Sequence, residues 1–361
     1  MNVVRRTLVR ESRFVRRAIR HPRIVQRRWR RVTSSQTAFI ELNHDTAETL
    51  LLVGSGRSGS TWLSEVLVEA FACRMIFEPL RRDRVPLSAG VPWGRYAEPG
   101  VMDPELEHVW GNILTGRVRC PWTDKFNAYR FPRRRLVKEI RATNTLPWLG
   151  ARFPEVPTIY LLRHPVATAW SAAQLGWDPF LSEFLGQPLL MDGPLAPWRD
   201  VIARHSADAD LFHRHVLRWC MENSVPIRQL APGSVHVVFY ENLVEDPHGE
   251  LQRLARYLGR FKEGAWDFDP ARPTVDRPSR ANYRKTPMMS ADERLRSWVD
   301  TVPAASVERA VALVKEFGLD HVYGADVRPN VTAEALLQGG TACPPGQGPG
   351  VSRGTESSTS R

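Results

Sequence analysis

The sequence has no hydrophobic run that approaches the roughly eighteen consecutive apolar residues of a membrane span. Its N-terminus also lacks the apolar core of a secretory signal. We therefore expect a protein of the cytoplasm. A chain of 361 residues is long enough to bury a full core, and one large domain with extensions is the simplest organisation for it.

Cysteine is scarce, and the cysteines form no C-x-x-C pair and no cluster with histidine. They are Cys73, Cys120, Cys220 and Cys343. This pattern speaks against a disulfide scaffold and against a zinc site. His213 and His215 are two residues apart, a spacing that does not place them on one face of a helix. We expect buried free thiols and no bound metal.

Acidic residues are nearly absent from the start of the chain. Residues 1–32 hold twelve arginines and one acid, Glu11, and so account for the whole net charge of +11. The rest of the chain is close to neutral, which means that the high isoelectric point describes an extension and not the body of the protein. We predict a basic N-terminal arm over residues 1–33.

Two interpretations of this arm are open. Val4, Leu8, Val15 and Ile19 lie within a narrow arc if residues 3–20 are helical, which suits a helix on an anionic membrane surface, at the inner face of the membrane. A mobile basic arm without a defined partner is the alternative. Specific nucleic-acid binding is not expected, because base stacking needs more aromatic residues than the arm contains.

Apolar segments that alternate with helical patterns predict an α/β fold. Five segments are typical of strands that are buried on both faces: residues 49–53, 74–77, 135–140, 157–162 and 234–240. We expect a P-loop-like parallel sheet of about five strands with helices on both faces.

The predicted domain spans residues 47–335. An irregular insert at residues 81–131 is expected to shape a substrate site or lid, and residues 292–317 have helical periodicity. A tail rich in Gly, Ser, Thr and Pro, residues 336–361, is expected to be disordered.

A glycine-rich turn follows the first predicted strand and leads into a helix. Gly54, Gly56 and Gly59 permit positive φ and close approach of the backbone, so successive N–H groups can point at an anion at the positive end of the helix. Hydroxyl side chains add further donors. These are Ser55, Ser58, Ser60 and Thr61. The turn therefore predicts a binding site for a phosphate-like anion.

Residues 54–61 match the nucleotide-binding pattern G-x-x-x-x-G-K-[ST] at every position except one. Ser60 stands where the pattern has the lysine that reaches the β- and γ-phosphates. Arg57, inside the turn, offers a planar guanidinium suited to two oxygens of one group. We therefore expect the turn to bind an anion without making the protein an ordinary ATPase.

Two segments resemble the signature motifs of sulfotransferases that use 3'-phosphoadenosine 5'-phosphosulfate (PAPS). The turn, from Ser55 to Trp62, resembles their 5'-phosphosulfate loop, and Arg163 and Ser171, eight residues apart, resemble their 3'-phosphate element. The resemblance covers roughly residues 48–325 and is nearest to the bacterial branch related to carbohydrate and tyrosylprotein sulfotransferases. It implies PAPS as the sulfuryl donor, with Tyr240 and Trp62 beside its adenine.

The resemblance departs at the catalytic base. Cytosolic sulfotransferases carry a histidine two residues after the lysine of the third strand. Here Ile140 stands two residues after Lys138. Glu78 is similar in position to the catalytic glutamate of the tyrosylprotein enzymes, and we expect it to be the base, with Glu139 as the alternative. Lys138 and Arg57 would stabilise charge on the leaving nucleotide, and this chemistry requires no metal.

The acceptor is not indicated by a motif. Aromatic residues at 93–129, together with Trp177, Phe180 and Trp198, suit either the core of a lid or a surface for a ligand. We expect a hydroxyl group of a small molecule or glycan: a carbohydrate, a glycolipid or a natural product.

Two other functions are alternatives. A P-loop kinase-like phosphotransferase is disfavoured by the missing lysine and by Arg163 in place of an acidic metal-binding residue. A non-catalytic basic membrane-binding protein leaves the polar residues at the strand ends unexplained.

Overall fold

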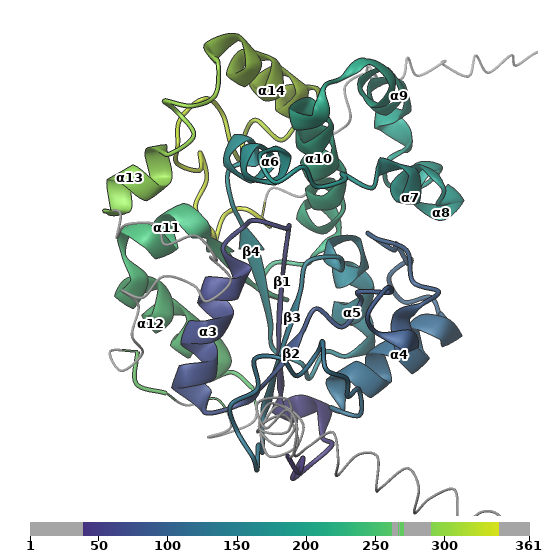
Figure 1. Cartoon of the computed structure of the whole chain (residues 1–361), viewed down its shortest axis with the longest axis vertical. Helices are drawn as coiled ribbons and strands as arrows, with labels where there is room; N and C mark the ends of the chain where they lie inside the picture. The colour runs from purple at the N-terminus through teal and green to yellow at the C-terminus, as the bar shows by residue number, and fades with distance from the viewer. Residues whose placement is uncertain (1–38, 262–265, 267, 271–289, 339–361) are drawn as a thin grey trace, which may run out of the picture.

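The computed structural model describes residues 39–261, 266, 268–270 and 290–338 (Figure 1). The predicted basic arm and residues 339–361 of the predicted tail lie outside the described residues. Among the helices of the described part, none is both long enough and apolar enough to cross a membrane. The domain boundaries stay predictions, although Phe39 and the side chain of Glu41 are already buried against the sheet.

The described chain forms a five-stranded sheet in which every neighbouring pair of strands is parallel. Its order is β2-β3-β1-β4-β5, which confirms the predicted fold class. The strands are β1 (Thr49–Gly54), β2 (Arg74–Phe77), β3 (Arg135–Glu139), β4 (Thr158–Leu162) and β5 (His236–Phe239). The chain crosses from β1 to one side of the sheet and later to the other, so the end of β1 is the topological switch point where ligands of such sheets bind.

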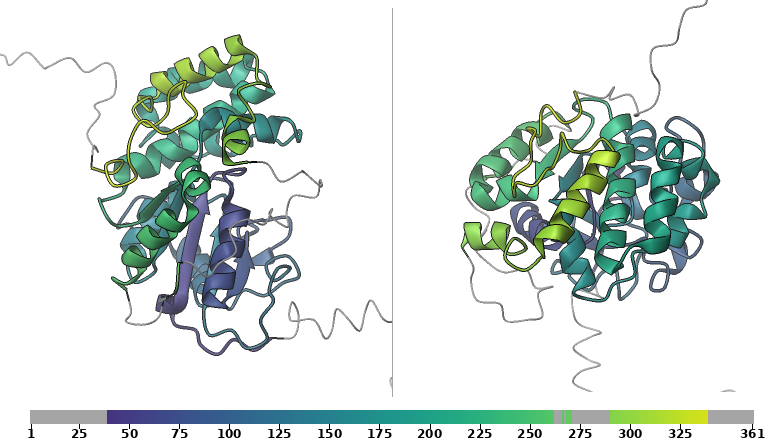
Figure 2. Two further views of the ribbon diagram at one scale, coloured as in Figure 1. Left: turned by 90° about the vertical axis from the view of Figure 1, so that its left-hand side faces the viewer. Right: turned by 90° about the horizontal axis from the view of Figure 1, so that it is seen from above.

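Helices cover both faces of the sheet (Figures 1 and 2). The helices are α3 (Ser60–Phe71), α4 (Pro104–Leu114), α5 (Leu146–Arg152), α6 (Pro165–Ala173), α7 (Leu181–Leu185), α8 (Pro188–Met191), α9 (Arg199–Asp208), α10 (Leu211–Gln229), α11 (Tyr240–Glu245), α12 (Pro247–Leu258), α13 (Ala291–Arg296) and α14 (Ala304–Glu316). Short 3-10 turns are η1 (Thr46–Glu48), η2 (Pro86–Ser88), η3 (Thr143–Thr145) and η4 (Ala196–Trp198).

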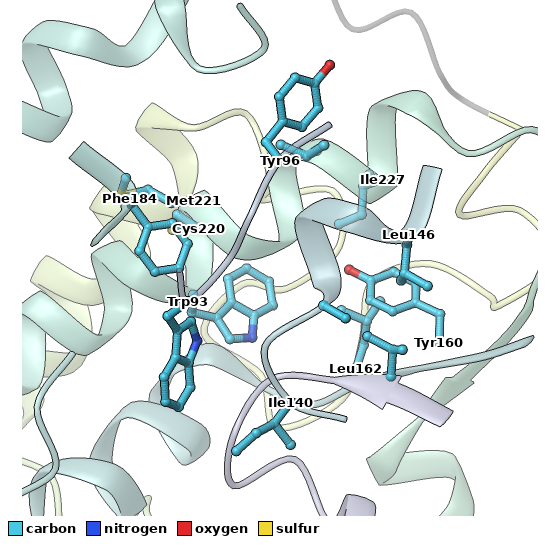
Figure 3. Close-up of a cluster of buried hydrophobic side chains, with 14 of the residues drawn as sticks. Trp93, Tyr96, Ile140, Leu146, Tyr160, Leu162, Phe184, Cys220, Met221 and Ile227 are labelled. Atoms are coloured by element: carbon cyan, nitrogen blue, oxygen red, sulfur yellow. The ribbon is translucent and has the colours of Figure 1, made fainter. Parts of the chain in front are cut away.

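Alternation along β1 divides the core into two layers. Leu50 and Leu52 pack with α3 and α12 on one face, whereas Leu51 and Val53 pack with α4, α5 and α10 on the other. Trp93, from the insert, lies in this second layer with Phe184 of α7 and Met221 of α10 (Figure 3). The insert is therefore part of the core at this point and not only a lid.

Two expectations about helices need correction, and one long helix was missed. The insert at residues 81–131 is not irregular throughout, because it contains α4, which Asp103 caps by accepting a hydrogen bond from the Leu106 N–H. The single helix expected over residues 292–317 is two helices, α13 and α14, and Pro303 precedes the second. The long helix α10 was not predicted.

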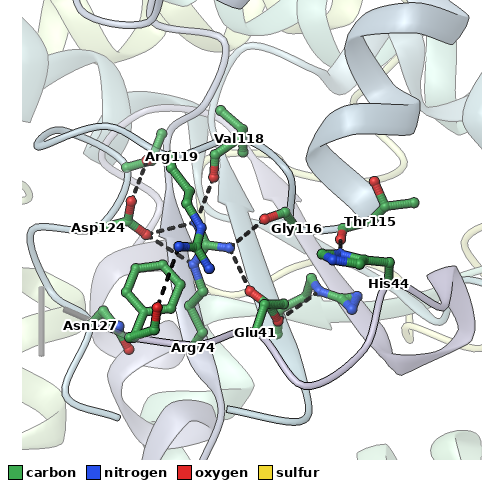
Figure 4. Close-up of polar contacts among 12 residues, drawn as sticks. Glu41, His44, Arg74, Thr115, Gly116, Val118, Arg119, Asp124 and Asn127 are labelled. Carbon is green, nitrogen blue, oxygen red and sulfur yellow. Dashed lines mark hydrogen bonds and ion pairs between the residues drawn. The ribbon is translucent and has the colours of Figure 1, made fainter. Parts of the chain in front are cut away.

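A buried ion-pair cluster fixes the amino ends of β2 and β3 (Figure 4). Arg74 and Arg135 are the first residues of these strands and lie opposite each other. Glu41 accepts from both, with Oε2 2.7 Å from Arg74 Nη1 and Oε1 3.3 Å from Arg135 Nε, and Asp124 lies 2.8 Å from Arg74 Nη2. Both arginine side chains are fully buried, so each charge needs its partner.

The change Glu41→Gln should lower the free energy of unfolding by about 3 kcal/mol, because it leaves two buried guanidiniums without their shared charge. Urea unfolding measures the effect. The exposed Glu98→Gln is the control and should change stability by less than about 0.5 kcal/mol. Equal stability of the two variants would show that the cluster contributes nothing.

Candidate functional site

The glycine-rich turn links β1 to α3 at the carboxyl end of the sheet. A Cβ on Gly54 would collide with the carbonyl oxygen of Leu161 on β4. Gly59 has φ +90°, and a Cβ there would lie 2.5 Å from the ring of Tyr240. Ser60 and Thr61 begin α3, whose N-terminus receives no side-chain cap in the described structure. The first N–H groups of α3 are therefore left without a side-chain acceptor, as a helix end that binds an anion requires.

The two predicted anion-binding motifs meet in the structure. Arg57 Nε donates to Ser171 Oγ at 2.9 Å, and Arg163 Nη1 donates to the Arg57 carbonyl oxygen at 3.0 Å. The Arg163 guanidinium also lies 4.2 Å from the ring centre of Tyr240, and the same ring lies beside Gly59. Trp62 lies in the first turn of α3 and is partly buried against the core layer that contains Leu50 and Leu52.

Neither of these two guanidiniums forms an ion pair within the described part of the chain. Burial lowers the pKa of Arg57, and the positive charge of Arg163 lowers it further. Two buried donor atoms in this group lack a hydrogen-bond partner among the described residues. They are Ser58 Oγ and the Nε of Arg163 itself. Repelling cations and unsatisfied donors around one turn are the features of a site that binds an anion.

A second group of candidates lies at the ends of β2 and β3. Glu78 Oε1 is 2.7 Å from Lys138 Nζ, and Glu78 Oε2 is 3.2 Å from Arg141 Nη1. Burial alone would raise the pKa of Glu78, but the charges and hydrogen bonds of Lys138 and Arg141 lower it to about 2. Glu78 is therefore an ionised carboxylate with a cation on each oxygen.

The alternative base, Glu139, is bound within the protein. Its Oε2 accepts from the Leu80 N–H at 2.7 Å, and its Oε1 accepts from the Ile140 and Arg141 N–H groups and from Arg141 Nη1. The side chain is fully buried. These contacts describe a carboxylate that holds the turn after β3.

Two candidate residues have an unusual backbone conformation. Arg57 and Glu78 have φ +70° and +44°, in the left-handed region that residues other than glycine rarely adopt. Such conformations cost roughly 1–3 kcal/mol each and persist where the surrounding structure enforces them, often at functional sites. Ala72 and Phe180 share this conformation, so the roles of Arg57 and Glu78 stay predictions.

The structure adds residues that the sequence analysis missed. The guanidiniums of Arg141 and Arg218 lie 4.3 and 4.4 Å from the ring centre of Trp93, and so connect Glu78 with α10. Glu222 pairs with Arg218 at 2.7 Å. The sequence signal that could have found this pair is the i, i+4 spacing of Arg218 and Glu222. This spacing indicates an ion pair only if the segment is known to be a helix.

The comparison that decides the family is a profile match. The profile of the sulfotransferase family matches residues 50–262, which is more than half of the chain and includes both anion-binding motifs. The chain belongs to the sulfotransferase family. A search of curated proteins finds no match.

Solved structures of sulfotransferases resemble this member of the family at low identity. The sulfotransferase domain of the Synechococcus olefin synthase is 17% identical, with a TM-score of 0.39, and the match covers 78% of this chain and 98% of that one. An Alicyclobacillus acidocaldarius sulfotransferase is 14% identical (TM-score 0.33; 74% and 93% covered). A mouse sulfotransferase complexed with PAP is 15% identical (TM-score 0.35; 79% and 88% covered).

His164 ties the end of β4 in this sulfotransferase to its C-terminal segment. The ring stacks on Trp298 at 4.6 Å, its Nδ1 accepts from the Val166 N–H, and its Nε2 lies 3.2 Å from the Gly324 carbonyl oxygen. Burial lowers the pKa of His164 to about 4. The folded protein therefore keeps this ring neutral where an unfolded chain protonates it, near pH 6.5.

Because unfolding takes up a proton at His164 between about pH 6.5 and pH 4, the free energy of unfolding should fall as the pH falls through this window. The slope from one such histidine is about 1.4 kcal/mol per pH unit. Urea unfolding at pH 7, 6 and 5 measures it. His164→Asn should make the dependence shallower, and an unchanged slope would contradict the assignment.

Proposed function

We propose that the protein transfers a sulfuryl group from PAPS to a hydroxyl group of an acceptor. The observation that carries this proposal is the pair of partly buried arginines, Arg57 and Arg163, which meet beside the glycine-rich turn and form no ion pair in the described structure. PAPS supplies two separate anionic groups for them. Family membership supports the same reaction.

The proposed donor site divides between the two motifs. The turn, with Ser55, Gly56, Ser58 and Gly59 and the amino end of α3, would bind the 5'-phosphosulfate. Arg163 and Ser171 would bind the 3'-phosphate, with Tyr240 and Trp62 beside the adenine. Arg57 belongs to the turn and contacts the other half, because its side chain reaches Ser171 and its carbonyl oxygen accepts from Arg163.

In the proposed reaction the acceptor oxygen attacks sulfur in line with the leaving phosphate oxygen. The new O–S bond forms as the S–O bond to the nucleotide breaks, and the hydroxyl proton passes to Glu78. Lys138 and Arg57 stabilise the charge that grows on the leaving oxygen. No step in this scheme requires a metal.

Lys138 would link the base to the leaving group. A carboxylate with a pKa of about 2 is a weak base, and Lys138 is one of the two cations that hold the pKa of Glu78 so low. When Lys138 Nζ turns to the leaving oxygen, Glu78 loses that charge and becomes more basic. Arg141 keeps the carboxylate in position at 3.2 Å.

The proposal also covers the class of acceptor, the cytoplasmic location of the enzyme and the binding of its N-terminal arm to a membrane surface. The acceptor is a small molecule or glycan with a free hydroxyl, and a cytoplasmic enzyme whose arm contacts an anionic membrane surface would reach glycolipids. The kinase-like alternative loses support because the chain belongs to the sulfotransferase family. No described observation favours the non-catalytic alternative.

Adenosine 3',5'-bisphosphate should raise the melting temperature without magnesium, since a ligand that binds only the folded state stabilises it. Arg163→Ala should remove most of this shift, because it deletes one of the two cations proposed to bind the nucleotide. Glu78→Gln and the exposed control Arg117→Ala should keep it. Protection by ATP that depends on magnesium, without protection by the bisphosphate, would instead favour a kinase.

The variants Glu78→Gln and Lys138→Met should both lose turnover, but they should differ in how the loss depends on the acceptor. Loss of the base should lower turnover of an alkyl alcohol about a hundred- to ten-thousandfold, but should affect a nitrophenol less, because its hydroxyl is more acidic. Lys138→Met should slow both acceptors alike with little change in nucleotide affinity. Labelled PAPS measures both rates. Near-normal turnover of the alkyl alcohol by Glu78→Gln would show that another group is the base.

A further inference from the structure

A short turn of the insert, around Thr123, covers the free edge of the sheet at β2. Because β2 is an edge strand, its outer N–H groups need acceptors from outside the sheet. The Thr123 carbonyl oxygen is one of them and lies 2.9 Å from the Phe77 nitrogen. Asp124, in the same turn, pairs with the buried Arg74 at 2.8 Å. The turn is therefore fixed to both ends of β2, directly before Glu78.

Trp122 extends this contact to Glu78 itself. Its indole Nε1 donates to the Glu78 carbonyl oxygen at 3.2 Å, and the Arg81 N–H donates to the same oxygen at 3.2 Å. The Glu78 N–H donates to the Lys138 carbonyl oxygen at 2.7 Å. Both backbone polar groups of Glu78 are thus hydrogen-bonded, and one of these bonds comes from a side chain of the insert.

The indole of Trp122 is itself held by an aromatic contact and two cationic ones. The Phe77 ring packs against it at an angle of 65°, with the ring centres 5.5 Å apart. Lys125 Nζ lies 3.6 Å from the indole ring centre, and the Arg81 guanidinium lies 4.4 Å from it. Since cations are attracted to the face of an aromatic ring, these contacts limit the rotation of the indole. The N–H of Trp122 therefore keeps its direction toward Glu78.

Glu78 needs this support because of its backbone conformation. Its φ of +44° lies in the left-handed region, which persists where the surrounding structure enforces it. The backbone sets the direction in which the side chain leaves the end of β2, and from there the carboxylate reaches Lys138 at 2.7 Å and Arg141 at 3.2 Å. If the backbone relaxed, the carboxylate would move relative to both cations.

We propose that Trp122 is a positioning residue for the proposed base. Its indole N–H holds the Glu78 backbone, and through the backbone it holds the carboxylate where the acceptor proton is taken up. The inference rests on the proposed function, because the position of Glu78 affects turnover only if Glu78 is the base. Misplacement of a reacting group by about 1 Å can cost about a hundredfold in rate. The turn around Thr123 thereby connects the buried ion pair of Arg74 with the base.

The change Trp122→Phe removes the indole N–H and keeps an aromatic ring beside Phe77 and Lys125. The kcat for an alkyl alcohol should fall about ten- to a hundredfold, whereas the kcat for a nitrophenol, which depends less on a base, should fall less than about threefold. The KM for PAPS should not change, because the donor site is intact. Labelled PAPS measures both rates. An equal loss for the two acceptors, or no loss, would overturn the proposal.

Trp148→Phe is the matched control. Trp148, on α5, also donates its Nε1 hydrogen to a carbonyl oxygen, that of Val101, at 2.8 Å. The same chemical change at this position should leave the ratio of the two kcat values unaltered. Protection by adenosine 3',5'-bisphosphate against thermal unfolding shows that each variant is folded. A ratio that changes equally in Trp148→Phe would show that loss of stability alone gives the effect, and would overturn the role of Trp122.

A double-mutant cycle tests whether Trp122 acts through Glu78. In the Glu78→Gln variant the base is already lost, so the addition of Trp122→Phe should lower the kcat for the alkyl alcohol by less than about a further twofold. Full additivity of the two losses would contradict the proposal, since Trp122 would then act independently of Glu78.

Three further results distinguish this inference from the proposed function. Absence of transfer from PAPS to any acceptor by the unaltered protein would refute the proposed function and the inference with it. Normal turnover by Glu78→Gln would refute the proposed base, and the role of Trp122 would fall with it. An acceptor-dependent loss in Glu78→Gln, without one in Trp122→Phe, would refute the inference alone.

Discussion

The proposed site depends on the repulsion between two partly buried guanidiniums. Arg57 and Arg163 are held together by a hydrogen bond from one side chain to the carbonyl oxygen of the other, although their charges oppose this arrangement. The fold enforces it through Ser171, through the ring of Tyr240 and through the left-handed backbone at Arg57. An anion relieves the repulsion, so binding energy is available from groups that are already in position.

The sheet topology explains why these groups meet. β1 lies at the switch point between β3 and β4, so its turn is flanked by Lys138 and Glu78 on one side and by Arg163 on the other. At the opposite edge of the sheet, the buried ion-pair cluster of Arg74 and Arg135 fixes the amino ends of β2 and β3. Rigid strands thus place a proposed donor site and a proposed base on neighbouring ends of one sheet.

Local patterns in the sequence were enough to predict the sheet and to locate two motifs that the structure brings together. The strand at residues 74–77 was predicted with its observed bounds, and the contact between Arg57 and Ser171 joins two motifs that were identified separately. The pairing of Glu78 with Lys138 and Arg141 depends on strand order, which periodicity does not specify. Arg218 and Glu222 were missed because α10 was not predicted, and their proximity to Gly56 is a tertiary contact.

The most direct test of the central account is calorimetry with three nucleotides: adenosine 3',5'-bisphosphate, adenosine 5'-phosphate and adenosine 3'-phosphate. If Arg57 and Arg163 together bind two anionic groups, the bisphosphate should bind at least about tenfold more tightly than either monophosphate, since each charged contact contributes separately. Equal affinity for the bisphosphate and for a monophosphate would contradict the account, because only one anionic group would then be recognised.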